Sequence, residues 1–446
     1  MSPITVNIGV VGAVDQVDLH QVLRQLFRIQ ELSLSGDFYS SDTLDELRKS
    51  APLLQTLIVD QGNMQGPGSL CKDLVLGETP HLRHLDVRYG CLSWSDMPFP
   101  HQLTTLKLSH NPFCARRPTV TQLLFALKMA TNLETLVLLN ISLPPSQDEI
   151  SQSGPIALLS YLSDIEIRSD FFSCIHLCRR ISHPTPAYMK ILCDVPHSHY
   201  SRDLLTEAPT DSLSELINKS VGPVKCLSMV LATDSDDYLG VHSIRTWPAP
   251  GPHWVPTISP PQFELHMVSH GFDSGLAAAK VIRAISVLLP RRDLQSLHVG
   301  NMYLREEFWV ETFGHLEELR NIRLEKSGGN GFLCALSAGI LDSDEGGDYE
   351  PTTMNFLGLH TLVCDEWEFD DRENDESPDL SQFLYYLQDR YGYQVALQDV
   401  YLWDCQNVDE DDIAKMRAAV GRLHWDGDAE AGSDSDVNSD ENSDDE

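Results

Sequence analysis

Three residues that can bind a transition metal lie close together in the segment FFSCIHLCRR, and His183 follows it. They are Cys174, His176 and Cys178. A tetrahedral zinc site needs thiolates and imidazoles that converge on one point. On a helix, Cys174 and Cys178 share a face, whereas His176 points about 200° away from Cys174. We therefore expect two core thiols here and no bound metal.

Other motifs for catalysis or cofactor binding are incomplete. Gly9 and Gly12 follow a strand-like segment, as in a dinucleotide-binding turn, but the third glycine of that motif is absent. We interpret this segment as a capping strand at the N-terminus. His197 and His199 have no neighbouring ligands, which is typical of a surface loop. The sequence has no GxSxG, HExxH, phosphate-binding-loop or kinase signature. We expect no catalytic site and no cofactor.

The acidic residues are concentrated in the C-terminal quarter. The chain has 66 acidic and 32 basic residues, a net charge of −34. Of the acidic residues, 28 lie in four stretches that contain a single base: 342–350, 365–379, 409–412 and 426–446. Nucleic acids and anionic membranes bind basic patches, so we expect neither as a partner.

Cysteine usage and the N-terminal residues indicate the compartment. The ten cysteines are scattered and form no CxxC pair, which is typical of a reducing environment. The N-terminal apolar run lacks a basic region before it and is broken by Asn7 and Asp15. No run of about 18 apolar residues is present to span a membrane. We expect an intracellular protein, cytoplasmic or nuclear.

The last stretch, 426–446, contains acidic and small polar residues with a single valine, a composition that predicts disorder. Ser433 and Ser443 each precede an acidic residue by three positions, the pattern that acidophilic kinases prefer. Phosphorylation would add about −1.5 to −2 charges at each site. The alternative is a solubilising tail without a specific partner.

A repeated apolar spacing organises the rest of the chain. Residues 82–87, LRHLDV, and 103–108, LTTLKL, both place a second apolar residue three positions after the first and a third two positions later. The last two have the period of a strand and point to one face. The first is expected to pack in the turn that leads into the strand. One such strand cannot bury its face alone, so its recurrence predicts stacked units with a continuous core.

The spacing of these units matches leucine-rich repeats. Their central residues are separated by 25, 28, 21, 30 and 29 residues, close to the 20 to 29 residues of such repeats. The residues are Leu32, Leu57, Leu85, Leu106, Leu136 and Ile165. Helical patterns occur between strands, as at 119–131. The signal weakens after residue 180, where we expect strands at 188–195, 224–231 and 263–269.

The pattern then resumes with strands at 294–299, 319–324, 359–364 and 397–402. A final helix is expected from Asp409 to about Arg422. Long loops are predicted near 240–262, 342–355 and 365–379, because they are rich in proline, glycine or acidic residues. The predicted fold is an α/β, irregular, horseshoe-like leucine-rich-repeat solenoid over residues 1–425, with parallel strands on the concave face, helices on the convex face and a disordered acidic tail.

The units LQTLIVD, LRHLDVR, LTTLKLSHNP, LETLVLLNIS and LSDIEIRS resemble the repeat region of mushroom-type fungal F-box proteins, over roughly residues 21–422. The asparagine or cysteine that ends a regular repeat is matched at Asn111, Asn140 and Cys405. In that family, an F-box binds a Skp-type adaptor of a ubiquitin ligase and the repeats hold the substrate. The segment DQVDLHQVLRQLF is too short for an F-box, so we expect either a truncated product or a repeat-only relative.

The strand residues that alternate with the buried ones are the candidate protein-binding site, because solenoids commonly bind on their concave sheet surface. Tyr401 and Trp403 have the side-chain types of interface hot spots. The alternative for each residue is a solvated sheet surface. The candidates are His84, Asp86, Arg88, Lys107, Glu166, Arg168, His298, Arg323, Glu325, Tyr401 and Trp403.

We expect a non-catalytic protein-interaction module that recognises substrates in an F-box-type (SCF) ubiquitin-ligase system. One alternative is a free-standing acidic scaffold that binds basic proteins such as histones, since acidic nuclear leucine-rich-repeat proteins have a similar tail. The other is an enzyme whose site has no recognised signature.

Overall fold

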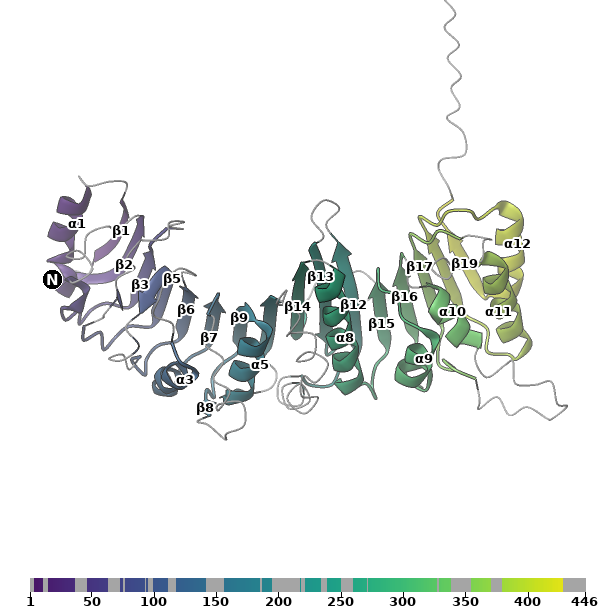
Figure 1. Ribbon diagram of the computed structural model, residues 1–446, viewed down its shortest axis with the longest axis horizontal. Helices are drawn as coiled ribbons and strands as arrows, with labels where there is room; N and C mark the ends of the chain where they lie inside the picture. The colour runs from purple at the N-terminus through teal and green to yellow at the C-terminus, as the bar shows by residue number, and fades with distance from the viewer. Residues whose placement is uncertain are drawn as a thin grey trace, which may run out of the picture. The chain divides into compact units, whose positions relative to one another are not determined.

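The computed structural model describes residues 4–10, 15–36, 46–62, 73–74, 77–92, 94, 99–110, 118–141, 156–184, 187–194, 217, 221–233, 239–249, 260–270, 272–326, 329–337, 354–369 and 379–427. The chain forms two compact units, residues 1–294 and 295–446. Both combine helices with a mostly parallel sheet (Figure 1), which confirms the predicted α/β class. No helix in the described ranges is both long and apolar enough to cross a membrane.

The first unit begins with parallel strands that follow one another in chain order. Each strand pairs with the next through β9, and β9 pairs with β11. The strands are β1 (Ile4–Val10), β2 (Ile29–Gly36), β3 (Thr56–Asp60), β5 (His84–Leu92), β6 (Thr105–His110), β7 (Thr135–Leu139), β9 (Asp164–Asp170) and β11 (Tyr188–Asp194). The short β4 (Asp73–Leu74) pairs with the end of β5, and β8 (Ala157–Leu158) pairs with β10 (Ile181–Ser182).

The predicted core positions of these strands lie side by side. Leu57, Leu85, Leu106, Leu136 and Ile165 are partners in consecutive strand pairs. Each is at most 1% exposed. This row of apolar side chains confirms the predicted register of the repeat.

The first apolar residue of each unit lies in a turn, as predicted. The backbone N–H of Leu82 donates to Thr79 O at 3.2 Å, and that of Leu103 donates to Pro100 O at 3.0 Å. Both leucines are fully buried. The next two amides share one acceptor, because Thr104 N and Thr105 N both donate to Arg83 O at 2.8 and 2.9 Å. The same arrangement recurs before β5, β7 and β9, so turn and strand form one repeated unit.

After β11 the strands no longer follow one another in chain order, and one of them is antiparallel to its neighbours. β14 (Phe263–His270) is parallel to β11, and β13 (Leu239–Trp247) is antiparallel to both β14 and β12 (Cys226–Thr233). The prediction of parallel strands throughout is therefore wrong here, and so is the prediction of a loop from residue 240. Val241 and Arg245 are partly exposed and lie on the opposite face of β13 from the buried His242, Ile244 and Thr246, which is the alternation of a strand.

Helices cover the face of the first sheet that bears the leucine row. α5 (Phe171–Arg180) packs against β9 and β11, and α8 (Phe272–Leu288) packs against β13 and β14. α3 (Val120–Met129) begins at the capping box of Thr119 and Gln122, which satisfies free amides at the helix start. The described part of this unit also contains α1 (Asp15–Leu23) and the 3-10 turns η1 (Leu26–Arg28) and η2 (Glu46–Arg48).

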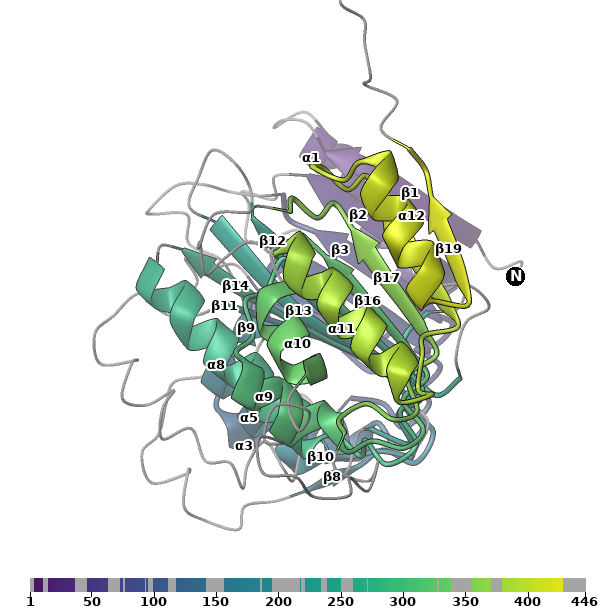
Figure 2. The same ribbon diagram turned by 90° about the vertical axis from the view of Figure 1, so that its right-hand side faces the viewer.

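Within its described residues, the second unit has five parallel strands, each paired with the next. They are β15 (Ser296–Gly300), β16 (Asn321–Glu325), β17 (Thr361–Asp365), β18 (Asp399–Trp403) and β19 (Arg422–Trp425). The helices are α9 (Glu306–Trp309), continued by a π-helical turn η3 (Val310–Gly314), α10 (Gly329–Ser337), α11 (Leu380–Gly392) and α12 (Glu410–Ala419). They lie on one face of this sheet (Figure 2).

The predicted final helix is shorter than expected. Asp409 is its N-cap, since its side chain accepts from Asp412 N at 2.8 Å. The helix ends at Ala419, and the chain then forms β19, which the sequence analysis did not predict. Of the predicted loops near 342–355 and 365–379, residues 342–353 and 370–378 lie outside the described residues, and Asp365 is the last residue of a strand.

Arg390 on α11 is fully buried in the second unit and binds backbone carbonyls. Its guanidinium donates to Asn355 O at 3.1 Å and to Phe356 O at 3.0 Å. Burial lowers the pKa of Arg390 to about 10, so the side chain remains charged at neutral pH. It therefore fixes the turn before β17, where Phe356 has a φ of 55°.

His242 on β13 makes the stability of the first unit depend on pH. Burial lowers the pKa of its imidazole to about 4, against about 6.5 in an unfolded chain. Between these values the unfolded chain takes up a proton and the folded chain does not, so stability falls as pH falls. We expect a loss of about 3 kcal/mol from pH 6.5 to pH 4. His242→Leu should remove most of this loss.

Hydrogen exchange of β13 and β14 peptides across this pH range measures the effect locally. His101 is exposed, and its replacement by asparagine is the control. Equal pH dependence in wild type and His242→Leu would contradict the assignment.

Candidate functional site

We use "open face" for the side of each sheet opposite the leucine row or its equivalent in the second unit. In the first unit, strand register aligns one polar row across this face, which we call the charge row. The charged members alternate in sign along the row, and the uncharged Val137 on β7 stands between two of them. The charge row consists of Asp86, Lys107, Val137, Glu166, Lys190, Glu264 and Arg245.

Glu264 is the centre of the polar contacts in this row. His266 Nε2 lies 2.8 Å from its carboxylate, and Tyr188 donates a hydrogen bond to it at 3.3 Å. Arg245 Nε lies 3.9 Å from the same group. Next to it, Lys190 Nζ and Glu166 Oε1 are 3.3 Å apart. The row therefore neutralises much of its own charge.

The surroundings shift the pKa values of two side chains in this row of contacts, Tyr188 and His266. Burial, and then the carboxylate of Glu264, raise the pKa of the Tyr188 phenol to about 12. Burial lowers the pKa of His266, although its hydrogen bond with Glu264 acts in the opposite direction. Tyr188 thus stays protonated and acts as a donor at neutral pH.

The structure places Asp86 differently from the prediction. Asp86 is only 3% exposed, because Arg88 covers it with a hydrogen bond of 2.8 Å from its terminal nitrogen and two of 3.2 Å from Nε. Asp86 therefore cannot meet a partner directly, whereas the Arg88 side chain is half exposed. His84 is partly buried, and burial lowers its pKa.

The other predicted residues of the first unit remain accessible. Arg168 is exposed, and Lys107 and Glu166 are partly exposed. Lys107 lies two strands from Glu166 in the same row, with Val137 between them. The prediction of one polar face is thus supported, with Asp86 as the buried exception.

The second unit brings four side chains into an aromatic cluster on its open face: Arg323, Tyr401, Trp403 and His424. The rings of Tyr401 and His424 stack at 4.2 Å with an angle of 7° between their planes. Tyr401 and Trp403 have ring centroids 5.5 Å apart. The guanidinium of Arg323 lies 5.6 Å from the Trp403 ring centroid, within range of a cation–π contact.

Acidic side chains hold this cluster in place. Asp365 forms an ion pair with Arg323, and both side chains are largely buried, at 11% and 19% exposure. Asp399 pairs with Arg422 at 2.7 Å and lies 3.5 Å from His424. Trp403 and Tyr401 remain partly exposed. The cluster is therefore preorganised and still accessible.

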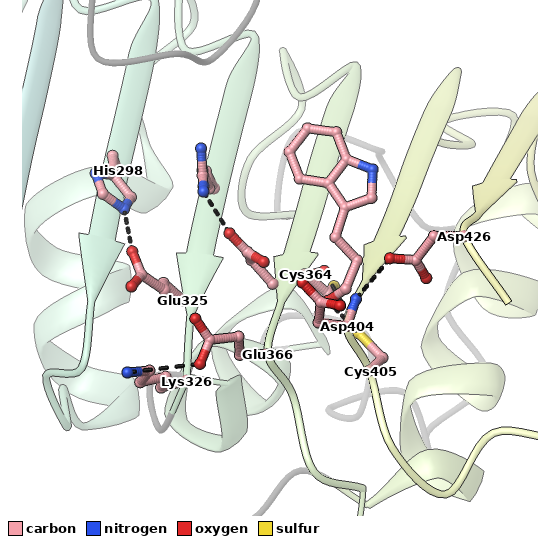
Figure 3. Close-up of polar contacts among 11 residues, drawn as sticks. His298, Glu325, Lys326, Cys364, Glu366, Asp404, Cys405 and Asp426 are labelled. Carbon is pink, nitrogen blue, oxygen red and sulfur yellow. Dashed lines mark hydrogen bonds and ion pairs between the residues drawn. The ribbon is translucent and has the colours of Figure 1, made fainter. Parts of the chain in front are cut away.

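A second group of ion pairs lies beside the cluster, and Figure 3 shows its members on neighbouring strands. His298 Nε2 and Glu325 Oε2 are 3.3 Å apart. The hydrogen bond with His298 lowers the pKa of Glu325. Lys326 and Glu366, the residues that follow β16 and β17, form a pair at 3.5 Å. His298, Arg323, Glu325, Tyr401 and Trp403 thus share one face, as predicted.

The sequence analysis missed the centre of the charge row. It did not single out Tyr188, Lys190, Arg245, Glu264 or His266, because the leucine pattern weakens after residue 180 and residues 240–247 were assigned to a loop. The alternation in YMKILCD and FELHMVS was the available signal. His424 was missed because residues 422–425 were taken as the end of the final helix and the residues just after it, and not as a strand.

The motifs considered for metal binding have structural roles where they are described. Cys174 and Cys178 are buried on α5, and burial raises the pKa of both thiols well above the usual range. Among the described residues, no group of three or more His, Cys, Asp or Glu side chains is placed to hold a metal ion. Gly12, Asn111, His197, His199, Ser433 and Ser443 lie outside the described ranges.

No protein-family model matches the chain, and a search of curated proteins finds no match to it.

Glu264→Gln should lower the pKa of Tyr188 from about 12, because it removes the negative charge that opposes ionisation. The pKa should remain above that of a free phenol, since burial is the larger cause. A titration followed by NMR of ring-labelled tyrosine measures this shift. Glu166→Gln is the matched control and should give a smaller shift, because Glu166 acts more weakly on Tyr188. An unchanged Tyr188 pKa in Glu264→Gln would contradict the arrangement.

Proposed function

We propose that this protein is a non-catalytic protein-recognition module of the leucine-rich-repeat solenoid type, which binds a protein through the open faces of its sheets. The aromatic cluster of the second unit is the observation that carries this proposal. Trp403, Tyr401 and Arg323 are of the residue types enriched in interface hot spots.

The geometry of the cluster favours binding in energetic terms. The ion pair with Asp365 and the ring contacts fix Arg323 and Trp403 before a partner arrives, which lowers the entropy cost of association. The charge row of the first unit contributes in another way. Exposed ion pairs are worth about 0 to 1 kcal/mol, so the row acts mainly on specificity.

The proposed context is substrate recognition in an F-box-type ubiquitin ligase. This part of the proposal rests on the resemblance of units such as LRHLDVR and LTTLKLSHNP to the repeat region of mushroom-type F-box proteins. In that context the open faces bind the substrate, and a Skp-type adaptor is a further partner.

A second candidate function rests on the acidic residues of the C-terminal quarter. A free-standing acidic scaffold would bind a basic protein such as a histone. Residues 426–446 contain ten acidic residues and no base. Under this proposal, histone binding weakens steeply with salt and with removal of residues 428–446, whereas substrate binding by the aromatic cluster does not.

Trp403→Ala should weaken binding of the protein partner by about 2 kcal/mol or more, which is about thirtyfold. Partners are captured by crosslinking in cells with wild type and variant, and the affinity of each is then measured with purified proteins. Tyr391→Ala is the matched control, because Tyr391 is a 59% exposed aromatic residue on helix α11. A partner set and affinities that are the same for wild type and Trp403→Ala would overturn the assignment of the binding face.

The ligase context has its own test. The full chain is mixed with a purified Skp-type adaptor, and complex formation is measured by size-exclusion chromatography. A stable complex supports the ligase context. Absence of a complex, together with a coding sequence that contains no F-box, overturns the ligase context and leaves the recognition module intact.

A further inference from the structure

Strand β19 forms an edge of the second sheet. It pairs in parallel with β18, and with no other strand among the described residues. Arg422 N donates to Gln398 O at 2.7 Å and Asp426 N to Leu402 O at 3.4 Å, so the even-numbered residues face β18. In a parallel ladder the residues between them point their N–H and C=O groups away. Leu423 and Trp425 therefore present backbone donors and acceptors at the free edge.

The apolar core is also incomplete at this strand. Leu423 and Trp425 are the register partners of Val400 and Leu402 on β18. Val400 and Leu402 are fully buried, whereas Leu423 and Trp425 are only partly buried. A further strand beside β19 would cover these side chains as β19 covers its neighbour. The edge thus offers hydrogen bonds and apolar area together.

The charge around the edge selects the kind of strand that fits. Asp426 follows β19 directly and accepts a hydrogen bond from Asp404 N at 2.8 Å. The first turn of α12, which packs on β19, carries Glu410, Asp411 and Asp412. The bases of the strand are already engaged, because Arg422 and His424 both contact Asp399.

We propose that the free edge of β19 binds an extended, basic peptide segment of a protein partner by strand addition. The partner contributes alternate apolar side chains over Leu423 and Trp425 and basic residues beside the surrounding acids. A second copy of this chain fits less well, because each copy has a net charge of −34 and like charges repel. This proposal concerns the sheet edge and stands independently of the open-face function.

The test uses the full chain and the peptide Lys-Lys-Thr-Val-Thr-Val-Lys-Lys. Two analogues carry backbone N-methyl groups, one on both threonines and the other on both valines. Their charge and side chains are the same, so only hydrogen bonding at one edge differs. Strand addition predicts that one analogue loses at least about tenfold in affinity, and that the other stays within about threefold of the parent. The analogue that fails shows whether the added strand is parallel or antiparallel.

Hydrogen exchange adds a second measurement. The parent peptide should slow exchange in the 422–427 segment, where the outward amides lie. Equal affinities of all three peptides would overturn strand addition in favour of unspecific charge attraction. Failure of the parent peptide to bind, or a dimer of the free chain that protects the same segment, would also overturn the proposal.

The charge requirement is tested at the first turn of α12. Replacing the exposed Glu410 and Asp411 by their amides should weaken peptide binding at least about fivefold in low salt. The matched control makes the same change at Glu306 and Glu307, which are exposed in the first turn of α9, and should leave the affinity within about twofold. Equal effects of the two replacements would overturn the role given to the acids near β19.

Discussion

The structure depends on one local constraint, the turn that precedes each repeated strand. A buried leucine closes this turn with its own amide. The next two amides share the carbonyl oxygen of the residue that stands directly before the preceding strand. Buried amides need partners, and a leucine turned toward water would lose about 2 kcal/mol of burial. Each strand therefore starts at a fixed point relative to its neighbour. Register follows from this, and register alone decides which side chains form rows on the open faces.

The two units use the same register for different surfaces. In the first unit it aligns acids and bases on neighbouring strands, and Lys190 and Glu166 are 3.3 Å apart. In the second unit it aligns Arg323, Val363, Tyr401 and His424 across four strands. Rings and a guanidinium bury more area and lose less solvation than carboxylates. Under the proposed function, the second unit would therefore contribute most of the affinity and the first unit most of the discrimination between partners.

The sequence predicted the strands wherever the leucine spacing was intact. Leu85 and Leu106 could be placed because their period and their turn agree with each other. The antiparallel strand β13 could not be placed, because the segment 239–247 does not have the leucine spacing and a proline-rich stretch follows it. The open-face residues were predicted from alternation alone. The burial of Asp86 was not predicted, because that burial depends on the rotamer of Arg88 and on the strands at both sides of β5.

The strand ends show how an irregular repeat can do without a regular asparagine ladder. Asn301, Lys326, Glu366 and Asp404 follow four successive strands, and each has a φ between 49° and 61°. This conformation costs a non-glycine residue of order 1 kcal/mol. It turns the amide of Lys326 toward Asp365 O, at 2.8 Å, and that of Glu366 toward Trp403 O, at 2.9 Å. The backbone thus supplies the hydrogen bond between neighbouring strands, and the side chain at this position is free to vary. Lys326 and Glu366 use that freedom to form an ion pair beside the aromatic cluster, so the same turn that fixes the fold also shapes the rim of the proposed site.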